Sequence, residues 1–252
     1  MTFKVVCLNL WHGNLLRQAI DWMKAENADL VLLQEVYDGR DTSWNDPGTR
    51  SRMMLEELGY AHQDYAPAFN KIIEQLPIPE GNLILSKFPI KKQSVTFFDI
   101  PFADNFEQHR GNFATTPRNL QHVVLDVDGT EVNVFNTQGV WGEDGNDNDR
   151  RLALGKTIAE AVRELPRVIL GGDFNVQEQT RSMAQIEDVG LKNIFKGELK
   201  STFNLRRKTN PGFATAVVDM LFVSPDVEVV EHACPNVDVA DHLPLVVTLE
   251  IK

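Results

Sequence analysis

Short hydrophobic runs and amphipathic stretches alternate along the whole chain. Runs rich in Val, Leu, Ile and Phe predict buried strands, because a strand covered on both faces shows no polar alternation. We expect strands or extended segments at residues 3–8, 29–36, 60–65, 81–90, 93–98, 120–127, 131–136, 168–170, 216–223, 227–231 and 245–251. Hydrophobic residues spaced three and four apart predict helices at residues 16–23, 51–58, 149–165 and 180–189, with Asn14 capping the first of them.

The order of these elements predicts two sheets and one domain. Asp128 and Gly129 separate two expected strands, which is a strong signal of a β-hairpin. Hairpins mixed with helical crossovers fit sheets packed face to face with helices outside them. The chain has no repeat, low-complexity tract or linker-like stretch, so we expect a single domain over residues 1–252.

The composition narrows the class of protein. With 42% hydrophobic and 24% charged residues, the chain is typical of a globular domain. A net charge of −11 argues against a protein that coats nucleic acid, but a nuclease stays possible because a bound metal can neutralise phosphate. The two cysteines form no disulfide framework, and we expect both to be reduced. No hydrophobic run is long enough to span a bilayer and no secretory signal is visible, so we expect a cytoplasmic protein.

Polar side chains that can accept hydrogen bonds or bind metal follow several of the hydrophobic runs. They are Asn9, Glu35, Asp173, Asn175, Asp219, Asp241 and His242. Strand ends at one edge of a sandwich can converge in space, and carboxylates gathered there need a cation or protons to neutralise them. Oxygen ligands with no cysteine and at most one histidine suit Mg²⁺ or Mn²⁺ better than zinc.

Eight short motifs occur in an order that is known from one enzyme family. They are L-N-L-W at 8–11, L-Q-E-V at 33–36, N-L-I-L-S-K-F-P at 82–89, R-N-L at 118–120, G-G-D-F-N at 171–175, S-T-F at 201–203, V-D-M-L-F-V-S at 218–224 and A-D-H-L-P at 240–244. Together they resemble the endonuclease/exonuclease/phosphatase superfamily, which has the deoxyribonuclease I-like fold. The resemblance implies a four-layer α/β/β/α sandwich, in which two mixed sheets lie between helices.

The resemblance also implies a metal site. Glu35 corresponds to the principal ligand of Mg²⁺ or Mn²⁺, and Asn9 lies beside it in the family's pattern. Asp241 corresponds to a second metal ligand or to a carboxylate that supports the neighbouring histidine. A hard cation of this kind keeps several waters, so one or two carboxylates and a substrate phosphate are enough to hold it.

The remaining motif residues correspond to catalytic groups. Asp173 resembles the residue that orients or deprotonates the attacking water, and Asn175 resembles a donor to the phosphate oxygens. His242 would stabilise charge in the transition state, while Asp219 would accept its other N–H and fix the ring. Whether Asp173 or a His–Asp pair acts as the base stays open at this level.

Two positions bear on substrate binding. Gln138 stands where family members commonly have a histidine; its amide can donate to a phosphate oxygen but cannot release a proton at neutral pH. Proton donation to a poor leaving group is therefore in doubt at this position. Arg118 either holds a substrate phosphate with two hydrogen bonds or is a surface residue at a strand start.

Other residues with chemical potential have ordinary structural interpretations. His12, His109, His122 and His232 lack ligand-like spacing. The basic run at residues 206–208 either meets a polyanion or is a solvated loop. A further set of aromatic residues either lines a substrate cleft or belongs to the core: Trp11, Trp44, Trp141 and Phe203.

The function expected from these observations is metal-dependent hydrolysis of a phosphodiester by in-line attack of water. A nuclease-like substrate comes first, with nucleic acid among the candidate partners, and no obligate protein partner is evident. The alternatives are a phosphatase, a phospholipid or sugar-phosphate diesterase, and a catalytically weak binding module that kept the fold, as Gln138 would allow.

Overall fold

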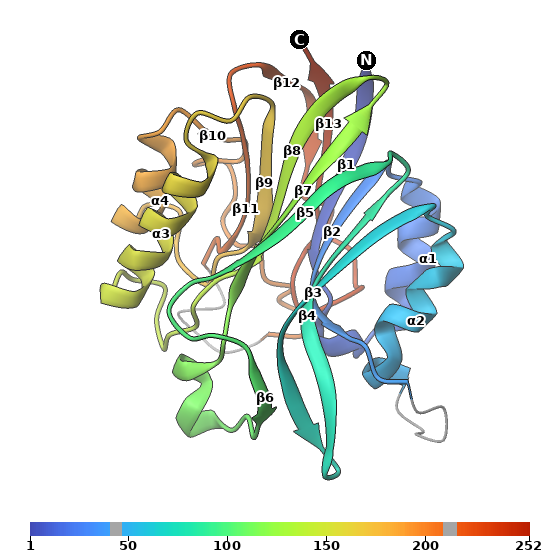
Figure 1. Ribbon diagram of the computed structural model, residues 1–252, viewed down its shortest axis with the longest axis vertical. Coiled ribbons are helices and arrows are strands. Elements are labelled where there is room, and N and C mark those ends of the chain that lie inside the picture. Colours follow the sequence, from blue (N-terminus) through green and yellow to red (C-terminus); the bar gives the residue numbers. More distant parts are fainter. Residues whose placement is uncertain (41–46, 209–215) are drawn as a thin grey trace.

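The computed structural model describes residues 1–40, 47–208 and 216–252, and in these ranges the strands form two mixed sheets (Figure 1). The seven-stranded sheet has the order β12 (Val227–Ala233), β13 (Leu245–Ile251), β1 (Thr2–Asn9), β2 (Leu30–Tyr37), β4 (Leu76–Ser86), β3 (His62–Ile73) and β6 (Ala103–Phe106). The six-stranded sheet has the order β10 (Lys192–Asn193), β11 (Asp219–Val223), β9 (Val168–Asp173), β8 (Thr130–Gln138), β7 (Asn119–Val127) and β5 (Ile90–Phe97).

Helices cover the outer faces of both sheets. The α-helices are α1 (Leu16–Glu26), α2 (Ser51–Leu55), α3 (Asp149–Val162) and α4 (Arg181–Glu187), and the short 3₁₀ helices are η1 (Trp11–Gly13), η2 (Pro47–Arg50), η3 (Glu56–Leu58) and η4 (Arg110–Thr115). Figure 1 shows α1 and α2 on one side of the molecule and α3 and α4 on the other, with the strands between them. The four-layer sandwich of two mixed sheets is thereby confirmed.

Three hydrophobic clusters correspond to the three interfaces between the layers. In β1, Val5 and Cys7 belong to the cluster between the sheets, whereas Val6 and Leu8 pack with Ile20 of α1. Both faces of this strand are therefore buried, which explains its unbroken hydrophobic run. A third cluster joins α3 and α4 to the six-stranded sheet.

The predicted elements are largely present, with three differences. Asn14 does not cap α1, because Leu15 holds that position and the Asn14 side chain donates to the Trp11 carbonyl instead. Strands β3 and β4 are longer than expected and form a hairpin that projects from the sandwich (Figure 1). The short strands β6 and β10 were not predicted.

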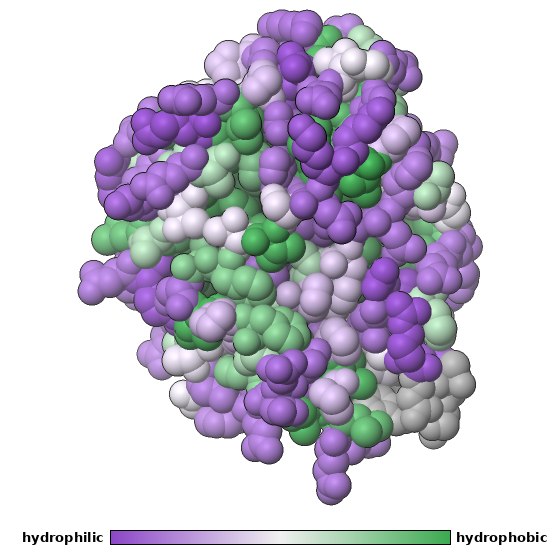
Figure 2. Space-filling view, viewed as in Figure 1, coloured by the Kyte–Doolittle hydropathy of each residue, from purple (hydrophilic) through white to green (hydrophobic). Residues whose placement is uncertain are grey.

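The distribution of hydrophilic and hydrophobic residues on the surface is consistent with the order of the layers. Figure 2 shows mostly hydrophilic residues over the helices on both flanks and hydrophobic residues gathered near the middle of the view, between α3 and β6. No helix in the described ranges is long and apolar enough to cross a membrane. Both cysteines are free thiols: Cys7 is buried and Cys234 is half-buried.

Candidate active site

Strand ends from both sheets meet at the candidate active site. In the six-stranded sheet, Asp173 at the end of β9 is paired with Gln138 of β8 and with Asp219 at the start of β11. In the other sheet, Asn9 ends β1, and Glu35 lies on the neighbouring strand β2. The Asn9 amide joins the two groups, since its Nδ2 donates to Glu35 Oε1 at 3.1 Å and to Asp173 Oδ2 at 3.0 Å.

Glu35 occupies an unusual backbone conformation. Its φ is +56°, at an irregularity in the pairing of β2 with β4, and strain of this kind concentrates at functional sites. Gln138 Nε2 donates to Glu35 Oε1 at 2.7 Å, and His12 Nδ1 lies 3.3 Å from Oε2. Burial alone would raise the pKa of Glu35, but the charge of His12 and the hydrogen bond from Asn9 outweigh it and lower the pKa to about 2. The carboxylate is therefore ionised at neutral pH.

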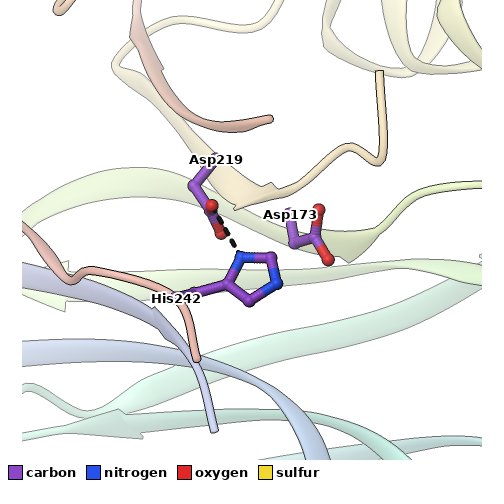
Figure 3. Close-up of side chains that lie close together, drawn as sticks. All are labelled: Asp173, Asp219 and His242. Carbon is purple, nitrogen blue, oxygen red and sulfur yellow. Dashed lines mark hydrogen bonds and ion pairs between the residues drawn. The ribbon is translucent and has the colours of Figure 1, made fainter. Parts of the chain in front are cut away.

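His242 and Asp219 form a buried pair. His242 Nδ1 and Asp219 Oδ2 are 2.8 Å apart, and Figure 3 shows the Asp173 carboxylate beside the same ring. Thr202 Oγ1 accepts from the backbone N–H of Asp219 at 3.1 Å, which fixes the strand start. The Phe203 ring contacts the imidazole edge at a centroid distance of 4.7 Å. The ring is thus held on several sides, with its Nδ1 committed to a carboxylate.

The charge state of His242 follows from its surroundings. Burial lowers the pKa of a histidine, but Asp219 and then Asp241 favour the charged form and raise the pKa of His242 to about 9. At neutral pH the imidazolium therefore donates from Nδ1 to Asp219 and presents a second N–H at Nε2.

The surroundings of Asp173 disfavour its ionised form. Its pKa rises to about 6, because burial and the nearby charges of Asp219 and Glu35 outweigh the attraction of His242. The backbone N–H of Asn175 donates to Asp173 Oδ1 at 2.9 Å. A carboxylate with a pKa near 6 remains mostly ionised at pH 7 and can still accept a proton readily.

Two contacts position Asn175 and the turn that carries it. Asn175 has φ of +56°, and its side-chain Nδ2 donates to the Gly139 carbonyl at 3.2 Å. Arg151 of α3, although 1% exposed, donates from Nη2 to the Asn175 carbonyl at 2.6 Å and from Nε to the Val140 carbonyl at 3.2 Å. One guanidinium therefore ties the segments after β8 and β9 to the same helix.

A second charged cluster adjoins Glu35 and was not predicted. Its centre is Glu80, which is 1% exposed and lies 3.3 Å from His12 Nε2, 3.8 Å from Arg118 Nη1 and 4.0 Å from Lys71 Nζ. Burial lowers the pKa of His12, but Glu35 and Glu80 together raise it. Arg118 is thus a buried residue paired with Glu80, and His12 bridges two carboxylates. His12 lies three residues after Asn9, and this closeness in sequence is the only signal that could have pointed to His12 before the structure was known.

Asp241 lies on the other side of His242. Its Oδ2 is 3.1 Å from Lys208 Nζ, and its Oδ1 is 4.0 Å from His242 Nε2. Lys208 ends the basic run at 206–208 and is part of the site, whereas Arg207 pairs with Asp238 away from it. In the described part of the chain, Asp241 makes no hydrogen bond or ion pair with Glu35 or Asn9, so the three expected metal ligands form two groups.

The aromatic residues divide between core and surface. Phe203 is 2% exposed and packs on His242, and Trp11 is half-buried against the cluster under α1. Trp141 lines a surface hollow with residues of η4 and the start of α3. Trp44 lies outside the described residues.

The donor set fits a hard divalent cation. Ionised Glu35 supplies oxygens, and Oδ1 of Asp219 and of Asp241 are buried without a hydrogen-bond partner. Buried carboxylate oxygens are costly unless a cation or a donor compensates them. Asp173, Asp219 and His242 place one ligand-type atom each within 4.8 Å of one another. Because His242 Nδ1 is engaged by Asp219, this trio is better suited to handling charge and protons than to holding the metal.

Comparisons with known proteins concern the family and the fold. A family model described as "Endonuclease/Exonuclease/phosphatase family" matches residues 6–242. No curated protein matches the chain in sequence. A solved endonuclease/exonuclease/phosphatase from Beutenbergia cavernae superposes with a TM-score of 0.76 at 18% identity, covering 99% of this chain and 72% of that one.

The descriptions of two further solved structures name a sugar phosphatase and a complex with DNA. A mannosyl-6-phosphatase from Bacteroides thetaiotaomicron has a TM-score of 0.71 at 17% identity, with 99% of this chain and 100% of that one covered. TDP2 from D. rerio, complexed with a single-stranded DNA product, has a TM-score of 0.67 at 15% identity, with 99% of both chains covered. At these identities the similarity concerns the fold.

Proposed function

Because the chain belongs to the endonuclease/exonuclease/phosphatase family, whose members hydrolyse phosphate esters, we propose that it hydrolyses a phosphodiester with the help of a divalent metal ion. The observation that carries the proposal is the single amide of Asn9, which hydrogen-bonds Glu35 and Asp173 and so joins the expected metal ligand to the expected water-activating group. Asp219 and His242 lie beside Asp173 in the same buried cluster.

Each side chain has a definite task in this proposal. Asp173 orients the attacking water and accepts its proton, for which its raised pKa of about 6 is suited. His242 donates from Nε2 to the phosphoryl oxygens and stabilises their growing charge, while Asp219 holds the ring through Nδ1. Asn175 and Arg118 contribute further donors to the phosphate through the N–H groups that their contacts with the Gly139 carbonyl and with Glu80 leave over. Glu35, with Asn9 beside it, and Asp241 would hold Mg²⁺ or Mn²⁺, which would neutralise charge on the phosphate and leaving oxygen.

Gln138 acts differently from the histidine common at its position. Its Nε2 donates to Glu35 at 2.7 Å, so it holds the metal-ligand carboxylate in place and supplies no proton to the leaving group. A substrate with a good leaving group, or one whose leaving oxygen is stabilised by the metal, suits this arrangement best.

The first experiment measures hydrolysis of an aryl phosphodiester and of plasmid DNA with Mg²⁺, with Mn²⁺ and with EDTA. We expect activity only with metal, and a loss of at least about 10²-fold in kcat for His242→Ala and Asp173→Ala. His232→Ala is the matched control, because His232 pairs with Glu198 on the surface. Full rates in the two site variants would disprove the assignment.

Calorimetry separates an enzyme from a binding module that kept the fold. We expect Glu35→Gln to weaken Mg²⁺ binding by about 10-fold or more, since a charged oxygen ligand is replaced by a neutral amide. Glu26→Gln, which alters a surface pair with Lys4, should leave the affinity unchanged. A protein that binds no Mg²⁺ would support the module instead.

The class of phosphoester that serves as substrate is the part of the proposed function that the site residues constrain least. The overall charge of −11 argues against extended contact with long nucleic acids, but a bound metal can neutralise phosphate locally, so a nuclease-like substrate stays the first candidate. The likeness to the mannosyl-6-phosphatase supports a sugar phosphate as the second candidate. A panel of nucleic acids, phospholipids and sugar phosphates, assayed for released product, decides between them. A cytoplasmic location stays a prediction, which fractionation of cells that express the protein would check.

A further inference from the structure

Lys208 reaches the candidate active site from a loop that otherwise faces solvent. Its Nζ lies 3.3 Å from His242 Nε2 and 3.1 Å from Asp241 Oδ2, and 4.2 Å from the centroid of the Phe203 ring. The side chain is 36% exposed, and its charged end contacts the buried residues Asp241 and His242. An ammonium over an aromatic face is attracted by the ring, which helps to fix this position.

The position of Lys208 matters because His242 has only one free nitrogen. Nδ1 is engaged by Asp219 at 2.8 Å, so Nε2 is the atom that can meet a substrate. Lys208 places a second N–H donor beside that same nitrogen. Two such donors side by side match two oxygens of one tetrahedral anion. An anion that binds both donors offsets the repulsion between the Lys208 ammonium and the His242 imidazolium.

The other positive groups near the site are engaged elsewhere. Arg118, His12 and Lys71 surround the buried carboxylate of Glu80. The Gln138 amide donates to Glu35, and the Asn175 amide donates to the Gly139 carbonyl. Within the described residues, Lys208 is thus the cation placed most directly beside the group expected to contact phosphate.

We propose that Lys208 is a catalytic residue that binds a non-bridging phosphoryl oxygen next to His242 and stabilises the charge that develops there. This inference rests on the proposed function and deepens it. Phosphoryl transfer depends mainly on positioning and on electrostatic stabilisation, and a lysine ammonium is a compact charge with three donors. Asp241 holds the ammonium in place, and Lys208 takes no part in proton transfer.

The test compares Lys208→Met with Lys208→Arg. Methionine keeps the unbranched stem over Phe203 and removes the charge, so we expect kcat/KM to fall about 10²-fold with most of the loss in kcat. Arginine restores a cation and should recover part of the rate. Arg206→Met, two residues earlier in the same basic run, is the control expected to match the wild type, because within the described residues the Arg206 guanidinium donates to the Asn236 carbonyl and lies near Asp238.

A second measurement does not depend on turnover. Inorganic phosphate is titrated into the metal-free proteins by calorimetry, where we expect Lys208→Met to weaken binding about 10-fold and Arg206→Met to leave it unchanged. A purely structural role of the pair with Asp241 would instead lower the melting temperature of Lys208→Met and leave the phosphate affinity intact.

The outcomes separate the two proposals. If the wild type hydrolyses no phosphoester but Lys208→Met loses phosphate affinity, the anion site stands and the proposed hydrolase function fails. If the wild type is active and Lys208→Met keeps both its kcat/KM and its phosphate affinity, the role of Lys208 is disproved while the hydrolase stands.

Discussion

Glu80 shows how one buried charge can organise several residues around an active site. Its carboxylate is almost completely buried and faces His12, Arg118 and Lys71. Removing one member of a buried ionic cluster leaves its partners uncompensated and is strongly destabilising. We therefore expect Glu80→Gln, which keeps the shape and removes the charge, to lower the free energy of unfolding by about 3 kcal/mol.

Urea denaturation measures this change. The matched control is Glu26→Gln, whose partner Lys4 lies at the surface, and it should cost less than about 1 kcal/mol. Equal effects of the two substitutions would contradict the idea that Glu80 is a structural centre of the cluster.

At the residue scale, the sequence was informative where a polar side chain follows a buried strand. Asp173 and Asp219 were recognisable because a carboxylate beside a hydrophobic run needs a reason to be there. Glu80 gave no such signal, because it lies in a proline-rich part of a hairpin strand, and Lys208 was noticed only as one member of the basic run at 206–208. Their roles arise only from the tertiary contacts with His12 and His242.

At the scale of elements, the turn after β8 controls the geometry of the site. A Cβ at Gly139 would lie 2.0 Å from the Phe174 carbonyl oxygen, and backbone cannot yield as a flexible side chain does. Gly139→Ala must therefore push apart the strand ends that carry Gln138 and Asp173. We expect a loss of about 2 kcal/mol in stability and a fall of at least about 10-fold in kcat.

The comparison for this prediction is Gly129→Ala in the β7–β8 hairpin. Gly129 has φ of +88° but open space around its Cβ position, so its substitution strains the turn without touching the site. Stability should fall there too, whereas kcat should not. A Gly139→Ala variant with wild-type kcat would show that the strand ends tolerate the shift.

The β7–β8 pair also carries a pH-sensitive residue. His122 stacks on Phe135 with ring centroids 4.1 Å apart, and its Nε2 lies 3.1 Å from Asn133 Oδ1. Burial outweighs the hydrogen bond with Asn133 and lowers the pKa of His122 below its ordinary value of 6.5. Below pH 6.5 the unfolded chain thus binds more protons than the folded one, and stability is lost as the pH falls.

We expect the wild type to lose more unfolding free energy between pH 7.5 and pH 5 than His122→Gln does, because glutamine cannot titrate. Urea denaturation at the two pH values gives both differences. An identical pH dependence in the two proteins would mean that His122 is protonated as easily in the folded state as in the unfolded state.

Element prediction was clearest for strands buried on both faces, and it missed the projecting part of the β3–β4 hairpin. β1 and β2 are buried on both faces and stood out as hydrophobic runs. β3 and β4 extend into a hairpin that includes Pro67, Pro77 and Pro79, residues that usually argue against strands. Eleven register pairs join β3 and β4 along their whole length, and no local pattern in the sequence indicates how far such a pairing extends.

At the scale of the whole molecule, a buried polar network links the two sheets. Gln34 of β2 donates to Asn136 Oδ1 at 2.6 Å across the sandwich, and Asn136 Nδ2 donates to the Leu33 carbonyl at 3.0 Å and to Gln121 Oε1 at 3.2 Å. All three amide side chains are completely buried. Hydrophobic contact alone would let the sheets slide, whereas directional hydrogen bonds fix one position in which Asn9 meets Asp173.

This network predicts that the two sheets unfold together and that Asn136 sets their alignment. Asn136→Ala leaves buried polar groups of Gln34 and Gln121 without partners, at about 1–3 kcal/mol for each group, so we expect a loss of about 3 kcal/mol in one cooperative transition. Calorimetry measures this loss of stability, and the ratio of van't Hoff to calorimetric enthalpy reports whether the chain behaves as the single domain predicted from its sequence.

The control is Thr130→Ala, at the start of β8 and away from the network, which should change stability by less than about 0.5 kcal/mol. Two separate transitions would show that each sheet folds with its own helices, and the active site would then be an interface between two units instead of the edge of one.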